Sequence, residues 1–355
     1  MYPCLEIDLH KIRHNTNYLV NMLKTHGVNI AAVTKVFCAD TKIIDAMLEC
    51  GIKYLADSRL ENIEAYPKND IPAMLLRLPS PKEAARVVKS CDISLNSEIA
   101  TLGELAVAAE DIGVTHSVVL MVDLGDLREG VYYSNEELLY NTAKFILSNK
   151  SLNFFGIGVN LTCYGSVLPT MDNMKKLIAT ARKIEQKLGI NLKVISGGNS
   201  SSLYLFENSD MPEGITNLRL GESIVRGLET AYGKPFGGLE KDAITLEAEI
   251  IELMDKPSYP EGEIGVNAFG EKIHYTDIGI RKRAILAVGR QDVAHENLEC
   301  MQPGITIIGS SSDHLIVDVT DSSESLSVGD ILTFSLSYGA ILSCFTSRYV
   351  GRRYI

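Results

Sequence analysis

The chain has 355 residues, of which 46% are hydrophobic and 22% charged, a composition that suits a soluble globular protein with a barrel-sized domain and a smaller second domain. No apolar run approaches the ~20 residues of a membrane-spanning helix, and the net charge of −11 argues against nucleic acid or an anionic membrane surface as a partner. The 7 cysteines include no C-x-x-C pair, so neither a zinc site nor a disulfide framework is indicated. An amino terminus without a secretory signal favours a cytoplasmic location.

The first strand candidate, Cys4–Leu9, precedes a region of regular alternation, and we expect it to join a second domain. From Asn29 to about Gly227, short β-rich runs alternate with stretches of helical periodicity, which indicates βα units around a parallel sheet. The β-rich runs are Ile30–Lys35, Lys53–Ala56, Ile71–Arg77, Cys91–Leu95, Ser117–Asp123, Phe155–Asn160, Leu192–Ser196 and Thr216–Leu220. The helical stretches include Thr41–Cys50, Pro81–Ser90, Ser97–Glu110, Asn135–Asn149 and Met171–Leu188. The number of runs predicts a closed TIM-type (β/α)₈ barrel over residues 10–232.

After about Tyr232 the pattern changes to β-rich runs separated by Gly, Pro, Asp and Ser, with no long helical stretch between them. These runs are Ile244–Leu253, Arg283–Val288, Ile305–Ile308, His314–Val319 and Ile331–Ser337. The sequence therefore predicts a carboxy-terminal antiparallel β domain over residues 233–355, with residues 1–9 joining it.

The polar residues at the ends of the barrel strands indicate the chemistry of the site, because reactive groups in this fold come from the carboxyl ends of strands. They are Lys35, Asp57, Ser58, Arg77, Asn96, Asp123, Arg128, Asn160, Asn199, Ser200, Arg219 and Gly221. The set contains one lysine and several cations, but no acidic pair of the glycosidase kind and no histidine cluster for a metal. It is typical of a site for a phosphorylated, electron-accepting cofactor.

Lys35 is the main chemical candidate, since it ends the first barrel strand at the barrel mouth. A partly desolvated amine loses its proton more easily, which suits formation of an imine with an aldehyde. The alternative is a structural lysine at a strand end that extends its amine into solvent and has no chemical role. The loop Ser196–Ser202 follows the seventh strand and Gly221 the eighth, where this fold most often holds phosphate. An ordinary turn is the alternative for that loop.

Six short motifs in this order resemble the alanine-racemase-type (fold type III) pyridoxal-phosphate (PLP) enzymes, nearest to their ornithine racemase branch. The motifs are Val33-Thr-Lys35, Leu55-Ala-Asp-Ser-Arg59, Asp123-Leu-Gly-Asp-Leu-Arg-Glu-Gly130, Gly156-Ile-Gly-Val-Asn160, Ser196-Gly-Gly-Asn-Ser200 and Leu218-Arg-Leu-Gly-Glu222. The likeness runs over essentially the whole chain.

The resemblance implies that Lys35 binds the PLP aldehyde and acts as one acid/base group. It implies that Arg128 contacts the phenolic oxygen of the cofactor and the substrate carboxylate, and that Arg219 hydrogen-bonds the pyridine nitrogen. An arginine there leaves the ring nitrogen unprotonated. Asn160 stands where many relatives place a histidine stacked on the ring.

The resemblance also implies phosphate contacts from Ser200, Gly221 and the backbone N–H of Glu222. Tyr338 resembles a tyrosine that touches the cofactor in related decarboxylases. A head-to-tail homodimer with shared active sites is implied as well.

Racemisation needs an acid/base group on each face of a planar carbanion, and Lys35 covers only one face. The Gly-Tyr-x-Asp-Gly segment of alanine racemases has no counterpart, since the matching stretch is Val288-Gly-Arg-Gln-Asp292. Candidates for the second group are Ser312, Asp313 and Cys344, and Asp313 could instead bind a distal ammonium of the substrate.

The resemblance and the surplus of carboxylates together predict a PLP-dependent racemase of a basic amino acid, with ornithine first and lysine or arginine next. A PLP-dependent decarboxylase of a basic amino acid and a non-catalytic PLP-binding protein are the alternatives.

Overall fold

The computed structural model describes residues 2–355, and the chain divides into two compact units. The barrel unit is Leu9–Lys241, and the β unit combines the amino-terminal residues up to Asp8 with Asp242–Ile355. The barrel unit extends beyond the predicted end at residue 232, because the following segment is hydrogen-bonded to its first helix. Asn15 accepts from Glu240 N, and Lys11 Nζ donates to the carbonyl of Lys241.

The barrel is a closed sheet of parallel strands, as the alternating pattern predicts. Its strands are β2 (Asn29–Val33), β3 (Tyr54–Asp57), β4 (Ala73–Leu75), β5 (Ile93–Asn96), β6 (His116–Asp123), β8 (Leu152–Gly158), β9 (Val194–Ser196) and β10 (Asn217–Leu220). The sheet closes because β5 pairs with β6 and β10 pairs with β2. A short extra strand, β7 (Val131–Tyr132), pairs with the end of β6. Each barrel strand overlaps one predicted run, so the predicted (β/α)₈ barrel is confirmed.

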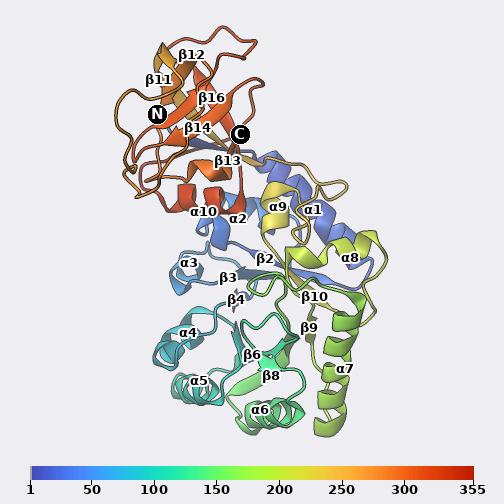
Figure 1. Ribbon diagram of the computed structural model, residues 1–355. Coiled ribbons are helices and arrows are strands. Elements are labelled where there is room, and N and C mark those ends of the chain that lie inside the picture. Colours follow the sequence, from blue (N-terminus) through green and yellow to red (C-terminus); the bar gives the residue numbers. More distant parts are fainter. Residues whose placement is uncertain (1) are drawn as a thin grey trace. The chain divides into compact units, whose positions relative to one another are not determined.

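Helices cover the outside of the barrel, and Figure 1 shows α4 to α7 arranged around its strands. The helices of this unit are α1 (Leu9–Lys24), α2 (Thr41–Leu48), α3 (Leu60–Glu64), α4 (Ala84–Ser90), α5 (Ile99–Asp111), α6 (Glu136–Ser148), α7 (Met171–Leu188), α8 (Tyr204–Glu207) and α9 (Glu222–Arg226). Short 3₁₀ turns are η1 (Lys35–Phe37), η2 (Pro81–Glu83) and η3 (Ser200–Ser202). Two of these turns, η1 and η3, directly follow barrel strands at predicted site positions.

Two apolar layers hold this unit together. Alternate residues of the strands, such as Val33, Leu95 and Met121, form one cluster. Their neighbours, such as Leu120 and Val122, pack instead in a larger cluster with the helices. Because successive strand residues point to opposite faces, the first cluster fills the barrel and the second lies between sheet and helices.

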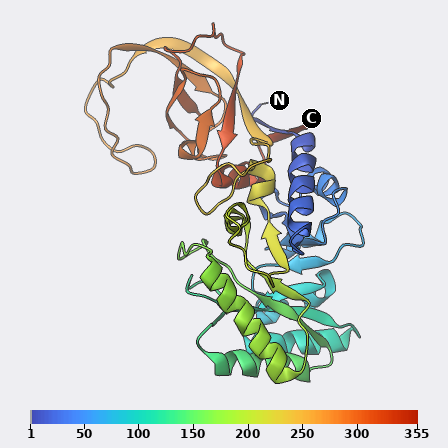
Figure 2. The same cartoon turned by 90° about the vertical axis from the view of Figure 1, so that its right-hand side faces the viewer.

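The β unit is built on the long strand β11 (Ile244–Pro257), which pairs antiparallel with β1 (Cys4–Ile7), β12 (Ile280–Leu286) and β16 (Ile331–Leu336). Its other strands are β13 (Leu298–Cys300), β14 (Thr306–Ser310), β15 (Leu315–Asp318) and β17 (Gly351–Tyr354), and a 3₁₀ turn, η4, spans His295–Asn297. Between β11 and β12, residues 258–279 form a long loop that leaves the sheet (Figure 2). The predicted antiparallel β domain is confirmed.

One feature of the β unit departs from the predicted all-β pattern. Helix α10 (Tyr338–Thr346) begins two residues after the end of β16 and is rich in apolar residues. Ser337 begins the helix by accepting a hydrogen bond from Ala340 N, a contact of the kind that starts helices. The apolar run reads equally well as a strand end, which explains why no helix was expected.

Within the described residues, no helix is long and apolar enough to cross a membrane.

Candidate active site

Lys35 lies two residues after the end of β2, at the start of η1 and at the carboxyl edge of the barrel, and its side chain is half-buried. The preceding Thr34 is anchored, because its hydroxyl donates to Asp57 Oδ2 at 2.6 Å. Two consecutive residues after the turn, Cys38 and Ala39, have left-handed φ angles of 49° and 54°. Such conformations are unfavourable for residues with a Cβ and are concentrated at functional sites. Lys35 is therefore held by a rigid and partly strained loop.

The Asp57 carboxyl is buried at the end of the neighbouring strand. It accepts hydrogen bonds from Arg59 N at 2.9 Å and from Asn62 Nδ2 at 3.1 Å as well as from Thr34. Burial raises the pKa of Asp57 above its usual value, although these hydrogen bonds oppose the shift. Every contact of this carboxyl is structural, so we assign Asp57 to supporting the Lys35 loop.

Arg219 is buried at the end of β10 and is surrounded by neutral acceptors. Its Nη2 donates to Val159 O and to Asn160 Oδ1, both at 2.6 Å, and its Nη1 donates to Ser196 Oγ. Burial lowers the pKa of Arg219 to about 10, while the nearby charge of Glu129 opposes that shift. The structure thus brings together three predicted strand ends, those of β8, β9 and β10.

Glu129 completes this group and was not a predicted site residue. Arg128 donates to both of its carboxylate oxygens through Nε and Nη2, and Asn160 Nδ2 donates to Oε1. A continuous polar chain therefore runs from Arg128 through Glu129 and Asn160 to Arg219. The signal was available in the sequence, since Glu129 follows Arg128 directly in the 123–130 motif.

A second acidic residue, Asp126, ties the loop after β6 to the loop after β8. Its buried carboxylate accepts from the backbone N–H groups of Thr162, Tyr164 and Val167 at 3.0–3.1 Å. Glycine is required at position 165, because a Cβ there would lie 2.5 Å from the Asp126 carbonyl oxygen. Asp126 thereby sets the relative position of the two loops that carry Arg128 and Asn160.

The predicted phosphate loop lies in η3 and beside the start of α9. Ser200 Oγ accepts from Ser223 N at 3.2 Å and lies 3.1 Å from Ser223 Oγ, so the loops after β9 and β10 are in contact. Ser201 Oγ is buried and has no hydrogen-bond partner among residues 2–355. Glu222 directs its carboxylate to Arg226 Nη1 at 2.6 Å, within its own helix. The buried hydroxyl groups leave hydrogen-bonding capacity for an anion at this place.

Gly221 joins β10 to α9 and permits a close approach of two strands. A Cβ at this position would lie 2.9 Å from the carbonyl oxygen of Val33, two residues before Lys35. The glycine therefore sets how closely the phosphate-loop side of the site approaches the Lys35 strand.

The β-unit candidates occupy two different environments. Ser312 and Asp313 lie exposed in the turn between β14 and β15. Gln291 N donates to the carbonyl of Ser312 at 3.0 Å, and a Cβ on Gly289 would lie 2.2 Å from that carbonyl oxygen. The 288–292 stretch is therefore packed against this turn.

The other two β-unit candidates lie on α10. Tyr338 is its first residue and is half-buried, whereas Cys344 is buried. Burial, assisted by the charge of Asp292, raises the pKa of the Cys344 thiol to about 12. At neutral pH this thiol is protonated and is a poor proton acceptor.

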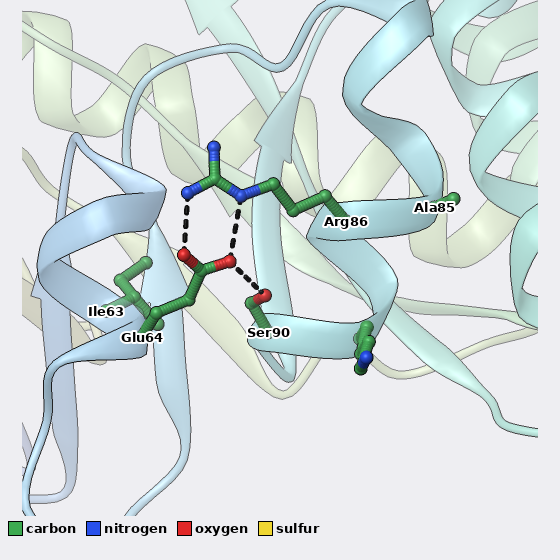
Figure 3. Close-up of a pocket in the computed structure, with 6 residues that line it drawn as sticks. Ile63, Glu64, Ala85, Arg86 and Ser90 are labelled. Atoms are coloured by element: carbon green, nitrogen blue, oxygen red, sulfur yellow. Dashed lines mark hydrogen bonds and ion pairs between the residues drawn. The ribbon is translucent and has the colours of Figure 1, made fainter.

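A surface hollow between α3 and α4 is separate from these residues (Figure 3). Its polar groups are already paired, since Glu64 accepts from Arg86 at 2.6 and 2.8 Å and from Ser90 Oγ at 2.9 Å. The paired groups have little capacity left for a ligand, so the strand-end cluster is the better candidate site.

Comparisons with known proteins agree with the fold. The alanine racemase N-terminal domain family matches residues 7–227. Ornithine racemase from Acetoanaerobium sticklandii is 47% identical over 352 residues, which cover 99% of each chain. Lysine racemase from Thermotoga maritima is 36% identical over 356 residues, covering 100% of this chain and 99% of that protein.

Two solved structures show the same fold at low sequence identity. Alanine racemase from Streptomyces coelicolor A3(2) superimposes with a TM-score of 0.76 at 18% identity, covering 99% of this chain and 97% of that chain. Alanine racemase from Bartonella henselae, whose structure contains covalently bound pyridoxal phosphate, gives 0.76 at 19% identity with 99% of both chains covered. From the match of the family model and the identity to its members over the whole length, this chain belongs to the alanine racemase family.

Proposed function

We propose that this chain is a PLP-dependent racemase that interconverts the L and D forms of a basic amino acid, ornithine first. The observation that carries this proposal is the 47% identity to an ornithine racemase over 99% of both chains. The 36% identity to a lysine racemase supports a basic side chain in the substrate. Both named relatives are racemases, which favours proton transfer at Cα over decarboxylation.

The residues present fit a phosphorylated pyridine aldehyde. The buried Ser201 hydroxyl without a partner and the neighbouring Ser200 suit a phosphate group. Arg219 is a buried cation whose hydrogen bonds go only to neutral acceptors, so it suits an unprotonated ring nitrogen. Lys35 supplies an amine at the carboxyl edge of the barrel. When bound, PLP supplies an electron sink that makes the α-hydrogen of an amino acid acidic.

We assign the roles within the barrel unit as follows. Lys35 would hold the cofactor through its aldehyde group and would move a proton at Cα on one face of the substrate. Arg219 would donate a hydrogen bond to the ring nitrogen and keep it unprotonated, while Arg128 would hold the substrate carboxylate and the phenolic oxygen. Ser200, Gly221 and the backbone N–H of Glu222 hold the phosphate. Asn160 is occupied by Glu129 and Arg219, so we assign it to orienting them rather than to stacking on the ring.

We assign the remaining roles to the β unit. Tyr338 would contact the cofactor, and the opposite-face proton donor would come from the set Ser312, Asp313 and Cys344. Exposure favours Ser312 and Asp313, since the Cys344 thiol is buried and its pKa is raised to about 12. Asp313 could serve instead as the partner of a distal ammonium on the substrate.

We further propose that the protein functions as a head-to-tail homodimer. Support comes from exposed apolar side chains on and beside the 258–279 loop: Val266 is 68% exposed, Ile278 60% and Ile280 64%. Exposed apolar residues that are grouped on one segment often mark an interaction surface, whereas single scattered ones do not. Sedimentation of the purified protein tests this, and a monomer that racemises at full rate would contradict it.

The central test combines borohydride trapping with isotope exchange. Reduction of the purified holoenzyme followed by peptide mapping should find the cofactor adduct on Lys35. Incubation with L-ornithine in D₂O should introduce deuterium at Cα and generate D-ornithine without release of CO₂. The Lys35→Ala variant should form no adduct, because it removes the covalent link. Its kcat should fall by about 10³-fold or more, because one acid/base group is also removed. A variant that remains yellow and racemises at the wild-type rate would disprove the proposal.

A further inference from the structure

We propose that Glu129 is a positioning residue that orients Arg128 directly and Arg219 through Asn160, so that the two guanidinium groups are held in place as one preorganised unit. The identity of the ligand groups that these arginines bind rests on the proposed function. The polar chain itself rests on the geometry of the barrel unit.

The first step concerns Arg128. Its Nε and Nη2 donate to the two oxygens of Glu129, and Nη1 donates to no residue within 2–355. A planar guanidinium held at two N–H groups cannot rotate about its terminal bonds. The Glu129 pair therefore leaves one defined edge of Arg128 for an anionic ligand.

The second step concerns the amide of Asn160. Its Nδ2 donates to Glu129 Oε1, and its Oδ1 accepts from Arg219 Nη2 at 2.6 Å. An amide has distinct donor and acceptor ends, so the carboxylate on one side dictates that the oxygen faces Arg219. A flipped amide would place two donors against each other. Glu129 thus sets the acceptor that Arg219 meets, although the two residues share no direct hydrogen bond.

The third step concerns charge. Burial disfavours ionisation of Glu129, but the hydrogen bond and charge of Arg128 outweigh burial and hold its pKa below the usual value. The carboxylate is therefore ionised and lies among two cations, which leaves a net positive charge in a partly buried site. Such a site favours a further anion, such as a carboxylate or a phenolate.

The backbone explains how adjacent residues can face each other. Leu127 precedes the pair with a left-handed φ of 59°, and Gly130 follows it with a φ of 120°. A Cβ on Gly130 would lie 2.7 Å from Asp123 N, so glycine is required there. Asp123 Oδ1 accepts from Gly125 N and Leu127 N and holds the turn. A left-handed φ is unfavourable for leucine, which indicates that this conformation serves the site rather than general stability.

The test exchanges the carboxylate of Glu129 and the amide of Asn160 between the two positions. In Glu129→Gln, the amide oxygen can replace either the oxygen shared by Arg128 Nη2 and Asn160 Nδ2 or the oxygen that accepts from Arg128 Nε, but not both, because the other end of the amide is a donor. In the double variant Glu129→Gln/Asn160→Asp, the new amide at position 129 can accept from Arg128 and donate to the new carboxylate at position 160. That carboxylate can in turn accept from Arg219, so donors and acceptors match again from position 129 to Arg219, while Arg128 keeps the hydrogen bond from Nε to position 129.

We expect kcat/KM of the Glu129→Gln holoenzyme to fall about 10²-fold, since misorientation of a binding group costs that much. The absorbance band of bound cofactor should shift, and its affinity should weaken. The double variant should recover about tenfold of kcat/KM and return the band towards its wild-type position.

The matched control is Glu49→Gln, which breaks the same two-pronged pairing with Arg13 at the surface of the same unit. It should leave the spectrum and kcat unchanged. The inference is overturned if Glu129→Gln lowers only the melting temperature while spectrum and kcat stay wild-type, or if the double variant is no better than the single one. Failure of the proposed function is a separate result, since the wild-type protein would then bind no cofactor or exchange no deuterium.

Discussion

The barrel unit and the β unit both carry predicted site residues, but they place them very differently. In the barrel, Arg128, Asn160 and Arg219 come from three separate strand ends and join one hydrogen-bonded group. In the β unit, Asp313 lies exposed in a turn and Cys344 is buried in a helix. A closed parallel sheet brings all its carboxyl ends to one edge, whereas antiparallel turns point in many directions.

The two units also satisfy polar groups by different means. Arg219 and Asp126 in the barrel unit are buried and are met by several partners from distant parts of the chain. The Ser312–Asp313 turn is held instead by backbone contacts with the 288–292 stretch. A substitution in the barrel should therefore disturb several partners at once, whereas one in the turn should act mainly through the side chain that is changed.

The largest effect that would sharpen this comparison is expected from Arg219→Lys. A single ammonium cannot replace a guanidinium that donates to three acceptors, so buried oxygens lose their partners. We expect kcat to fall by about 10²–10³-fold, the loss seen when one electrostatic donor is removed from an active site. Steady-state racemisation measures this. Arg182→Lys, an equivalent change on the exposed face of α7, should have no such effect.

A smaller effect should distinguish the two β-unit environments. Asp313→Asn should lower kcat by about 10²-fold if this carboxylate transfers a proton, or raise KM if it binds the distal ammonium. Cys344→Ser should leave kcat near the wild-type value, because the thiol is buried and protonated. Racemisation rates measured for both variants at several substrate concentrations separate these cases. A strong loss from Cys344→Ser alone would break the proposed distinction.

The smallest effect concerns stability and reports on the barrel alone. His116 is buried beside Ser94, and burial lowers its pKa from 6.5 to about 4. The folded state therefore keeps this ring neutral while the unfolded state takes up a proton below pH 6.5. Stability is full above that pH and is lost as pH falls towards 4, by about 2 kcal/mol at pH 5.

Denaturant unfolding of the barrel at pH 7 and pH 5 measures this difference. His116→Gln can retain a hydrogen bond to Ser94 and should flatten the pH dependence. An unchanged slope in that variant would show that another group is responsible.

Much of the barrel and its site was predictable because strand position alone determines where a side chain emerges. Eight apolar runs predicted the closed sheet, and residues at their ends proved to be neighbours, although the chain separates Arg128 and Arg219 by many residues. Helix α10 was missed, because an apolar run after a strand carries no local mark of its conformation other than the Ser337 cap.

The amino-acid sequence by itself determined the alternation of strands and helices, the lysine at the first strand end and the family to which the chain belongs. Only the tertiary structure decided that Glu129 links the two arginines, that Asp126 ties two loops together, and that Cys344 is buried while Asp313 is exposed. The physical reason is that periodicity reports which face of an element is buried, whereas hydrogen-bond partners and burial of single polar groups depend on residues that are distant in the chain.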